Sequence, residues 1–247
     1  MMLLVSLIIL ISARSIFVKE VDYQAIANDL NEKNMDKILN AVDGYAKIKN
    51  KTFIVTSILE NQDEIKVNEN ESSFEGVYNT IGDNALGTGQ VIFKSGLERK
   101  DAKEQIKEEE SLEFPVNYSN NQYTNKETNE GLDLIFMIDK LQGIEKIVPI
   151  SYGDEPDRSP RIYYDLSEQE FKEILNDDLK IEYDKFTKAT IFIGLLEGKE
   201  GKLFIPEIFI GVEWEEKANN GRTIGYKMSN STYFDDDNLK AKRKYKK

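Results

Sequence analysis

The chain has no cysteine and no histidine, so carboxylates, lysines, tyrosines and serines are the side chains that could do chemistry. Without a thiol there is no disulfide, no thiolate nucleophile and no cysteine-type zinc or iron–sulfur site. Without an imidazole, Ser-His-Asp and Cys-His catalysis, histidine metal sites and a histidine-based pH switch are excluded. The Ser-x-x-Lys pattern, which activates a serine without histidine, is also absent. The sequence therefore indicates no catalytic residue and no cofactor.

Acidic residues leave one enzymatic reading open. Two carboxylates that flank a sugar bond suffice for glycoside hydrolysis, but among 45 acidic residues the sequence singles out no pair. Residues 235–238 (DDDN) could offer oxygen ligands to Ca²⁺, yet the EF-hand spacing and its distal glutamate are missing. We interpret this run as a solvated acidic segment and residues 154–157 (DEPD) as a polar turn, so no metal site is predicted.

Residues 82–89 (GDNALGTG) have the glycine content of a phosphate-binding loop. Such a loop needs a following helix N-terminus to present its amides, whereas a strand pattern, QVIF, follows here. We therefore predict a hairpin turn.

Charge is unevenly distributed. Residues 238–247 carry six basic and no acidic side chains and residues 1–18 carry one arginine, so the net charge of −12 leaves −19 on residues 19–237. A body this acidic repels nucleic-acid phosphates, and no nucleic acid is expected as a partner. The basic tail could make weak contact with a membrane or wall surface, or it could be a solubilising tail. Its candidate partner-binding residues are Lys240, Lys242, Arg243, Lys244, Lys246 and Lys247.

The N-terminus has the pattern of an export signal. Residues 1–13 (MMLLVSLIILISA) are apolar and uncharged. A helix of that length spans roughly 20 Å, which is shorter than the ~30 Å hydrocarbon core of a bilayer. This favours a signal-peptide-like segment, although the basic n-region is missing. The alternative is a buried N-terminal strand or helix of a cytosolic protein.

Residues 11–14 (ISAR) look like the lipobox of bacterial lipoproteins, with Arg14 in place of the lipidated cysteine. We therefore expect a lipoprotein-like protein, secreted or associated with the bacterial cell envelope, that is cleaved or weakly anchored.

The first half combines helical and strand patterns. Residues 21–41 predict two short helices with a break at Asn34. The charged residues 97–112 predict a solvated helix. Between them, short runs separated by Asn, Asp and Gly indicate an antiparallel meander, with strands at 52–58, 64–67, 73–79 and 89–95.

The second half repeats this order. Residues 131–143 predict a helix, with a buried strand as the alternative, and Ser167 to Glu170 form a capping-box sequence at the start of a short helix. Pro206 predicts a bend or bulge in the last long strand. The strands are expected at 161–166, 180–186, 188–197, 202–215 and 223–229.

Together these patterns predict an α+β fold with antiparallel β-meanders and short helices packed on one face, arranged as one sheet or as two tandem α+β units. The Asn-rich residues 117–131 would be a linker or loop. The expected organisation is a signal-peptide-like segment (1–18), an N-terminal α+β unit (19–116), the linker or loop (117–131), a C-terminal α+β unit (132–237) and the basic tail (238–247).

Two stretches carry a family resemblance. Residues 35–46 (MDKILNAVDGYA) and residues 76–79 (GVYN) resemble an uncharacterised family of predicted lipoproteins from Gram-positive bacilli. The likeness covers residues 20–95, and Arg14 departs from the family's lipidated cysteine. The resemblance implies export and assigns no activity.

The expected function is that of an exported, non-catalytic, envelope-associated protein that binds a partner protein or envelope component. Two alternatives stay open: a carboxylate-dependent hydrolase of cell-wall glycans, and an inhibitor or immunity-type protein with an acidic binding face. Strand Trp214 could line a binding face or pack in the core.

Overall fold

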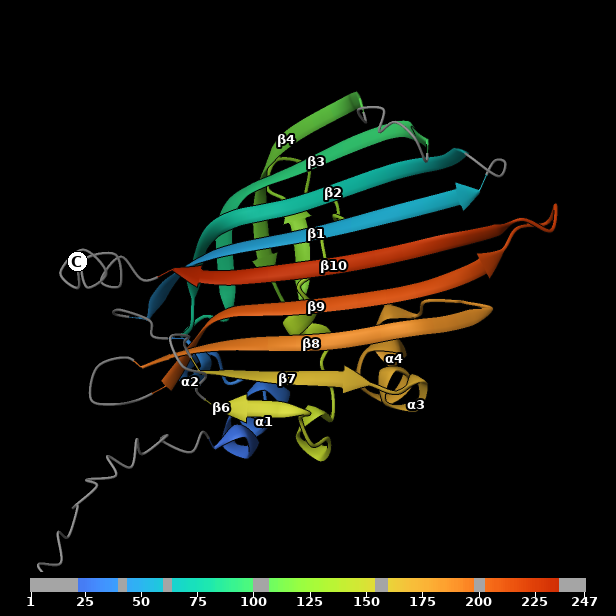
Figure 1. Cartoon of the computed structure of the whole chain (residues 1–247). Coiled ribbons are helices and arrows are strands. Elements are labelled where there is room, and N and C mark those ends of the chain that lie inside the picture. The colour runs from blue at the N-terminus through green and yellow to red at the C-terminus, as the bar shows by residue number, and fades with distance from the viewer. Residues whose placement is uncertain are drawn as a thin grey trace, which may run out of the picture.

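Strands β1 and β10 join the two halves of the chain in one sheet (Figure 1). The computed structural model describes residues 22–39, 44–59, 64–99, 107–153, 160–197 and 203–235. β1 (Tyr45–Leu59) and β10 (Thr223–Asp235) pair antiparallel from Lys47 opposite Asp235 to Ile58 opposite Ile224. β1 begins one meander and β10 ends the other, so the described strands follow the order β5-β4-β3-β2-β1-β10-β9-β8-β7-β6.

The remaining strands are antiparallel to their neighbours throughout. Their bounds are β2 Glu64–Asn79, β3 Asn84–Arg99, β4 Lys107–Ser119, β5 Gln122–Asn125, β6 Ser151–Gly153, β7 Arg161–Leu166, β8 Lys185–Glu197 and β9 Leu203–Lys217. The helical elements are α1 Tyr23–Asn31, α2 Met35–Ile38, the 3₁₀ turns η1 Met137–Lys140 and η2 Ile144–Lys146, α3 Glu168–Phe171, the π-helical turn η3 Lys172–Asn176 and α4 Asp177–Leu179.

The predicted α+β class is wrong, and so is the tandem arrangement: the fold is essentially all-β. The meanders do not form separate units, because β1 of one pairs with β10 of the other and leaves one ten-stranded sheet. Within the described residues the longest helix, α1, has nine residues. Helices this short can cover part of a sheet, but they do not form a helical layer large enough to change the fold class.

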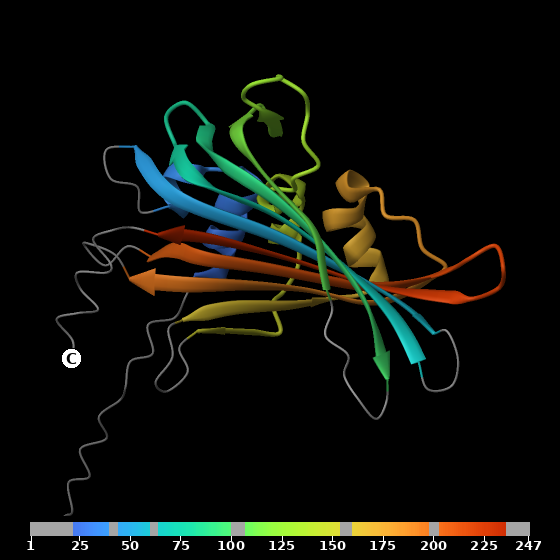
Figure 2. The ribbon, with the colours of Figure 1, turned by 90° about the horizontal axis from the view of Figure 1, so that it is seen from above.

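All the described helices lie on the same side of the sheet, which we call the inner face (Figure 2). Successive strand residues point to opposite faces, so every second residue of each strand faces this layer. The inward residues of both meanders belong to a single buried core, which removes apolar surface from water. Examples are Ile48, Phe74, Tyr78, Val116, Ile162, Tyr164, Ile191, Ile208, Ile210, Val212 and Met228.

The opposite face, the outer face, carries ion pairs between neighbouring strands. The Lys Nζ to Glu Oε distances are between 2.7 and 3.3 Å in four such pairs: Lys49–Glu75, Lys51–Glu71, Lys185–Glu215 and Lys227–Glu213. Exposed pairs of this kind add at most about 1 kcal/mol each. They mark the outer face as one that water solvates.

Several predictions for the first half are confirmed. Two short helices form and Asn34 is the N-cap of α2. β2 is one strand where two short ones were expected. The solvated helix at 97–112 is wrong for the residues described, because Arg99 ends β3 and Lys107 begins β4. Of the charged residues there, Glu110 lies on β4, where a charge on an unpaired stretch of strand discourages pairing between copies of the chain.

The second half departs from its predicted pattern in two places. Residues 117–131, the expected linker or loop, contain the end of β4 and all of β5. Residues 131–143 form an extended segment followed by η1, so the predicted helix is wrong. The segment stays extended because the Ile135 carbonyl oxygen accepts hydrogen bonds from the side chains of Asn50 and Asn230 in the sheet. In a helix, this oxygen would bond a backbone N–H of the helix instead. The bulge at Pro206 is confirmed, because the β8–β9 register shifts between Gly194 and Leu196.

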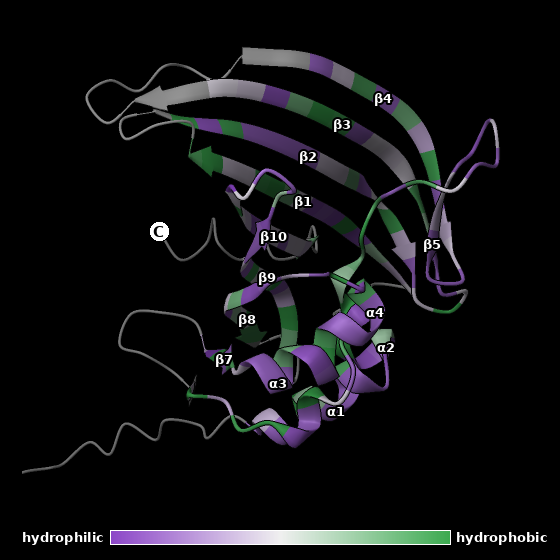
Figure 3. Ribbon diagram, turned by 90° about the vertical axis from the view of Figure 1, so that its right-hand side faces the viewer, coloured by the Kyte–Doolittle hydropathy of each residue, from purple (hydrophilic) through white to green (hydrophobic). Residues whose placement is uncertain are grey.

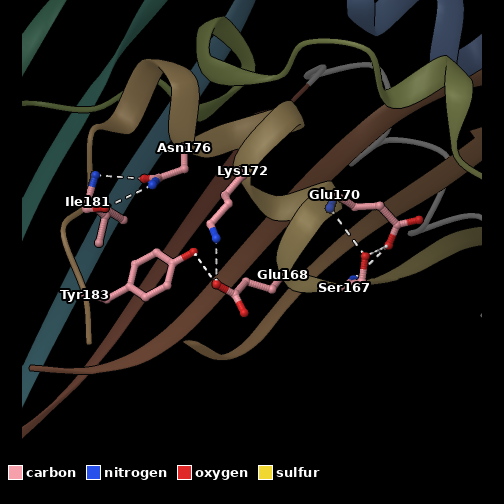
Figure 4. Close-up of polar contacts among 7 residues, drawn as sticks. All are labelled: Ser167, Glu168, Glu170, Lys172, Asn176, Ile181 and Tyr183. Atoms are coloured by element: carbon pink, nitrogen blue, oxygen red, sulfur yellow. Dashed lines mark hydrogen bonds and ion pairs between the residues drawn. The ribbon is translucent and has the colours of Figure 1, made fainter. Parts of the chain in front are cut away.

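A short helical layer, α3-η3-α4, covers β7 and β8 (Figure 4). It begins at the predicted capping box, in which Ser167 Oγ accepts from the Glu170 N–H at 3.3 Å and the Glu170 carboxylate accepts from the Ser167 N–H at 2.7 Å. It ends where the Asn176 amide bonds both backbone groups of Ile181. Phe171 stacks on Phe186 at 5.2 Å between ring centroids, which fixes this layer against β8.

Four buried polar residues lie at the β1–β10 junction. Asn230 Nδ2 donates to Asn50 Oδ1 and to Thr52 Oγ1, both at 2.9 Å, and Thr232 Oγ1 donates to Asn50 Oδ1 at 3.0 Å. All four side chains are at most 2% exposed. We call Asn50, Thr52, Asn230 and Thr232 the amide cluster. Its polar groups satisfy one another, which burial without water requires.

We expect Asn230→Ala to lower the free energy of unfolding by about 3 kcal/mol, because it leaves Asn50 and Thr52 buried without their donor. Urea titration followed by circular dichroism measures the change. The control is Asn68→Ala, which removes one 3.4 Å bond to Thr56 from a partly exposed site on the same face. That control should stay within about 1 kcal/mol of the unmodified protein, and equal losses in the two variants would contradict the role of the amide cluster.

Candidate functional site

The inner face is not covered along its whole length in the described structure. Figure 3 shows β1 to β4 arching away from α1, α3 and α4. Phe93 and Leu112 are 37% and 55% exposed there, and Ile54, Val91 and Phe114 are partly exposed. We call this surface the open face; its inward-facing residues are Ile54, Asn70, Ser72, Val91, Phe93, Glu110, Leu112 and Phe114.

A cleft of about 200 Å³ lies at the inner end of the open face. The sheet forms its floor and the extended segment 132–135 forms its wall. Its floor residues are Thr52, Ile54, Asn70, Ser72, Val91 and Phe114, and its wall residues are Leu132, Asp133, Leu134 and Ile135. This volume suits one apolar side chain of a ligand and does not suit a large cofactor.

The amide cluster holds the wall in place. Asn50 Nδ2 donates to the Ile135 carbonyl oxygen at 2.5 Å, and Asn230 Nδ2 lies 3.2 Å from the same oxygen. The Leu132 N–H donates to the Tyr123 carbonyl oxygen at 2.9 Å. Because both ends of the segment are bonded to the sheet, the cleft is formed before any ligand arrives.

The floor of the cleft mixes apolar and hydrogen-bonding groups. In the part of the chain that the structure describes, the side chains of Asn70 and Ser72 have no hydrogen-bond partner, and no ion pair crosses the open face. Gly89 leaves room for Phe114, since a Cβ at Gly89 would lie 2.6 Å from its ring. The floor of the cleft therefore fits apolar groups and uncharged hydrogen-bonding groups of a ligand.

Asp139 is buried just beyond the wall, in η1. Its side chain is 7% exposed; the Tyr118 hydroxyl donates to its carboxylate at 2.6 Å, and Lys33 Nζ donates to its backbone carbonyl at 2.7 Å. Burial raises the pKa of Asp139 from 3.8 to about 6, opposed by the Tyr118 hydrogen bond and by the charge of Lys33. Burial, and then the Asp139 carboxylate, raise the pKa of Tyr118 far above 10.0, so Tyr118 stays a donor.

A second tyrosine–aspartate contact lies nearby. The Tyr78 hydroxyl donates to the Asp83 carboxylate, and burial raises the pKa of Tyr78 well above its ordinary range. Tyr78 and Tyr118 pack with their ring centroids 6.2 Å apart. These contacts tie η1 to β2 and β4, so the ionisation of Asp139 acts on the base of the wall.

Among the described residues, no three acidic side chains are grouped to hold a metal ion. Asp139 is the one acid among them that is less than a tenth exposed, and its carboxylate accepts a hydrogen bond from the Tyr118 hydroxyl. This contact holds η1 against β4.

Two other clefts are polar. The larger, about 510 Å³, lies on the outer face over the Lys49–Glu75 and Lys51–Glu71 ion pairs. The second, about 350 Å³, lies between the α1–α2 turn, the start of η2 and η3, and Lys33, Lys146, Glu145 and Glu173 line it. The charged groups of these two clefts already face water or one another, so they offer little apolar surface to a ligand. The open face is therefore the better candidate for a binding site.

A family model described as a domain of unknown function (DUF3952) matches residues 9–110. The match runs from residue 9 to the first residues of β4 and ends at residue 110. This agrees with the expected resemblance to an uncharacterised family over residues 20–95; the lipoprotein character and the Gram-positive origin stay predictions. No curated protein matches the chain.

Two solved structures are distantly similar to the chain. One, titled "Lipid-protein interactions in lipovitellin", has 7% identity and a TM-score of 0.40 over 78% of this chain and 25% of that chain. The chain therefore spans about a quarter of that protein. Another, the translocator domain of autotransporter NalP from Neisseria meningitidis, has 8% identity and a TM-score of 0.15 over 85% and 95% of the two chains. Scores this low support no functional conclusion.

Most residues singled out in the sequence lie outside the described residues. These are the basic residues Lys240, Lys242, Arg243, Lys244, Lys246 and Lys247, the acidic run after Asp235, the turn at 154–157 and the segment 1–18. Among the helices that the structure does describe, none is long and apolar enough to cross a membrane.

The described candidates have structural roles. A hairpin turn forms as predicted, but at residues 80–83, and residues 84–89 of the predicted turn belong to β3. In the turn, Asn79 Oδ1 accepts hydrogen bonds from the backbone N–H groups of Ile81 and Gly82. Trp214 is 7% exposed and stacks on Tyr226 at 5.1 Å between ring centroids, so it packs in the core.

Sequence reasoning missed the open face. The polar residues 68–72 (NENES) separate the strands predicted at 64–67 and 73–79, yet in the structure they continue β2. The signal that could have found it is alternation: Asn68, Asn70 and Ser72 fall on one face, and Glu69, Glu71 and Ser73 on the other. An uncharged face beside a charged one indicates a strand that is not solvated equally on both sides.

Asp139→Asn should stabilise the protein above pH 6. The folded state holds the Asp139 proton more tightly than the unfolded chain does, so this group's contribution to stability is fully present below pH 3.8 and is lost as the pH rises to about 6. The loss amounts to about 3 kcal/mol at most. The substituted amide would keep an acceptor for Tyr118 without the charge, so the difference in unfolding free energy between the two proteins should grow over this interval.

Urea titrations at pH steps from 4 to 7 measure that difference. The matched control is Asp133→Asn, an exposed carboxylate of the same segment. A pH profile for Asp139→Asn that parallels that of the unmodified protein would contradict the assignment.

Proposed function

We propose that this chain is an exported, non-catalytic binding protein of the bacterial cell envelope, and that it binds a partner protein through the open face. The observation that carries the proposal is the open face itself: a stretch of the inner face with exposed Phe93 and Leu112 and a preformed cleft at its end. Contiguous apolar surface of this kind marks interaction sites in soluble proteins.

The chemistry of the open face favours a protein ligand. Ile54, Val91 and Phe114 offer contact to an apolar side chain, and Asn70 and Ser72 offer hydrogen bonds to a peptide group or a polar side chain. Because its lining residues are mostly apolar and aliphatic, the cleft suits a buried side chain better than a sugar ring, which would bring hydroxyls that need partners. The absence of thiol and imidazole from the sequence is compatible with a role by contact.

Export is supported by the apolar, uncharged residues 1–13 and by the resemblance to predicted lipoproteins. The envelope is accordingly the place where we expect the partner. The basic side chains at 240–247 could add a weak contact with an anionic surface.

Val91→Lys should abolish saturable binding to envelope proteins, because the longer, charged side chain would occupy the cleft and replace part of its apolar floor. The probe is a detergent extract of bacterial envelopes, applied at increasing concentration to the immobilised protein, with the retained proteins quantified by mass spectrometry.

The matched control is Ile92→Lys. Ile92 is the next residue of β3, partly exposed like Val91, but it points to the outer face. Binding should survive this change. Loss of binding in both variants, or no saturable binding by the unmodified protein at micromolar concentrations, would refute the proposal.

A further inference from the structure

The open face ends at a strand edge that has no neighbour in the described structure. β5 pairs only with Val116 to Ser119 of β4. Before Val116, β4 pairs with β3 on one side, and on the other side the described backbone supplies a single hydrogen bond, from the Lys126 N–H to the Pro115 carbonyl oxygen at 3.0 Å. The stretch from Glu110 to Phe114 is therefore an exposed sheet edge.

That one bond fixes which backbone groups face outward. The N–H and C=O of a strand residue point to the same side and successive residues alternate. Since the Pro115 carbonyl points away from β3, the backbone groups of Glu113 and Ser111 do so too, while Leu112 and Phe114 bond β3. The register irregularity of β3–β4 lies beyond Glu110 and does not interrupt this alternation. Two donors and two acceptors are thus aligned along the edge.

The side chains of Leu112 and Phe114, in the same stretch of β4, form part of the open face. Leu112 and Phe114 point to the open face beside Phe93 and Val91, and Leu112 is 55% exposed. An edge strand whose exposed apolar side chains continue an apolar face is normally covered, because otherwise it pairs with other chains. In this protein β4 has both features: its backbone edge is unpaired between Glu110 and Phe114, and its apolar side chains continue the open face.

We propose that the edge of β4 between Glu110 and Phe114 accepts an extended segment of a partner protein as an additional strand, with its alternate apolar side chains on the open face. The added strand would bond the outward groups of Ser111 and Glu113 and would lie in line with β5. Backbone bonds give such complexes their affinity, and the pockets for alternate side chains give them specificity. The inference rests on the proposed function and names the binding mode and the class of ligand.

The acidic side chains of the β4 edge indicate what charge the ligand should carry. Residues 110–114 (ESLEF) carry two acidic side chains, Glu110 and Glu113, and no basic one, and the chain around them is acidic overall. A segment with alternating apolar and basic residues complements this edge, whereas an acidic one is repelled. The preferred occupant is thus an extended basic and apolar peptide segment.

The test uses the full chain and a fluorescein-labelled synthetic peptide of alternating lysine and valine, with affinity measured by fluorescence anisotropy. Ser111→Pro removes one outward N–H, and Pro115, which faces the same side of the strand, shows that β4 accommodates proline there. Ser111→Ala is the matched control, because both variants lose the 3.2 Å bond between Gln90 Nε2 and Ser111 Oγ. We expect Ser111→Pro to weaken binding roughly tenfold relative to Ser111→Ala.

A second measurement does not depend on the folding of any variant. The same peptide with alternate backbone amides N-methylated keeps its side chains but loses the donors of one edge, and it should bind at least about tenfold more weakly to the unmodified protein. A peptide of alternating glutamate and valine should bind more weakly still.

Equal affinities for Ser111→Pro and Ser111→Ala, or for the plain and methylated peptides, would overturn the inference. So would sedimentation analysis showing that two copies of the chain pair through β4 and exclude the peptide. If the Val91→Lys variant nevertheless loses its envelope partners, the proposed function stands and only the strand-addition mode fails.

Discussion

The pairing of β1 with β10 is the constraint on which the rest of the structure depends. Without it the chain would be two meanders, each with a bare edge; with it they become one sheet with one core. The amide cluster sits on these two strands and bonds the Ile135 carbonyl. A buried amide needs a partner at a fixed position, so the cluster selects this register over a slipped one and places segment 132–135 across the sheet.

A sheet of this width presents more inner face than the short helices cover. Around β7 to β10 the layer is complete, since Ile191, Ile208 and Trp214 are buried beneath it. Along the far ends of β1 to β4 it is not, and Phe93 and Leu112 stay exposed within the described structure. Glu110 and Glu113 of β4 discourage pairing between copies of the chain, because their charges would repel one another, and they leave the edge open to a segment of opposite charge. The exposed Leu112 and the glutamates that select the ligand's charge therefore lie on the same strand, β4.

Local features of the fold were predictable because short-range chemistry determines them. The break at Asn34, the capping box at Ser167 and the bulge at Pro206 each follow from one residue and its near neighbours. The β1–β10 pairing was not predictable, since it joins residues about 180 positions apart and neither strand differs in pattern from an edge strand. The class was misjudged for the same reason. The candidate site depends on this pairing and on the hydrogen bonds from Asn50 and Asn230 to Ile135. All of these contacts are long-range, so no short sequence motif could have predicted the site.

The wall of the cleft is held in place before a ligand binds, and this affects which ligands the open face favours. The wall is held at Ile135 by two amides and, four residues on, at Asp139 by Tyr118 and Lys33, so a ligand would not have to order it. Binding to a surface that is already ordered loses less free energy to conformational entropy, which favours a flexible partner segment that must itself become ordered. Asp139 is the weaker of the two anchors, because its burial opposes the charge it carries near neutral pH. The amides carry no charge, so the β1–β10 junction keeps the cleft in place whatever the protonation state at its base.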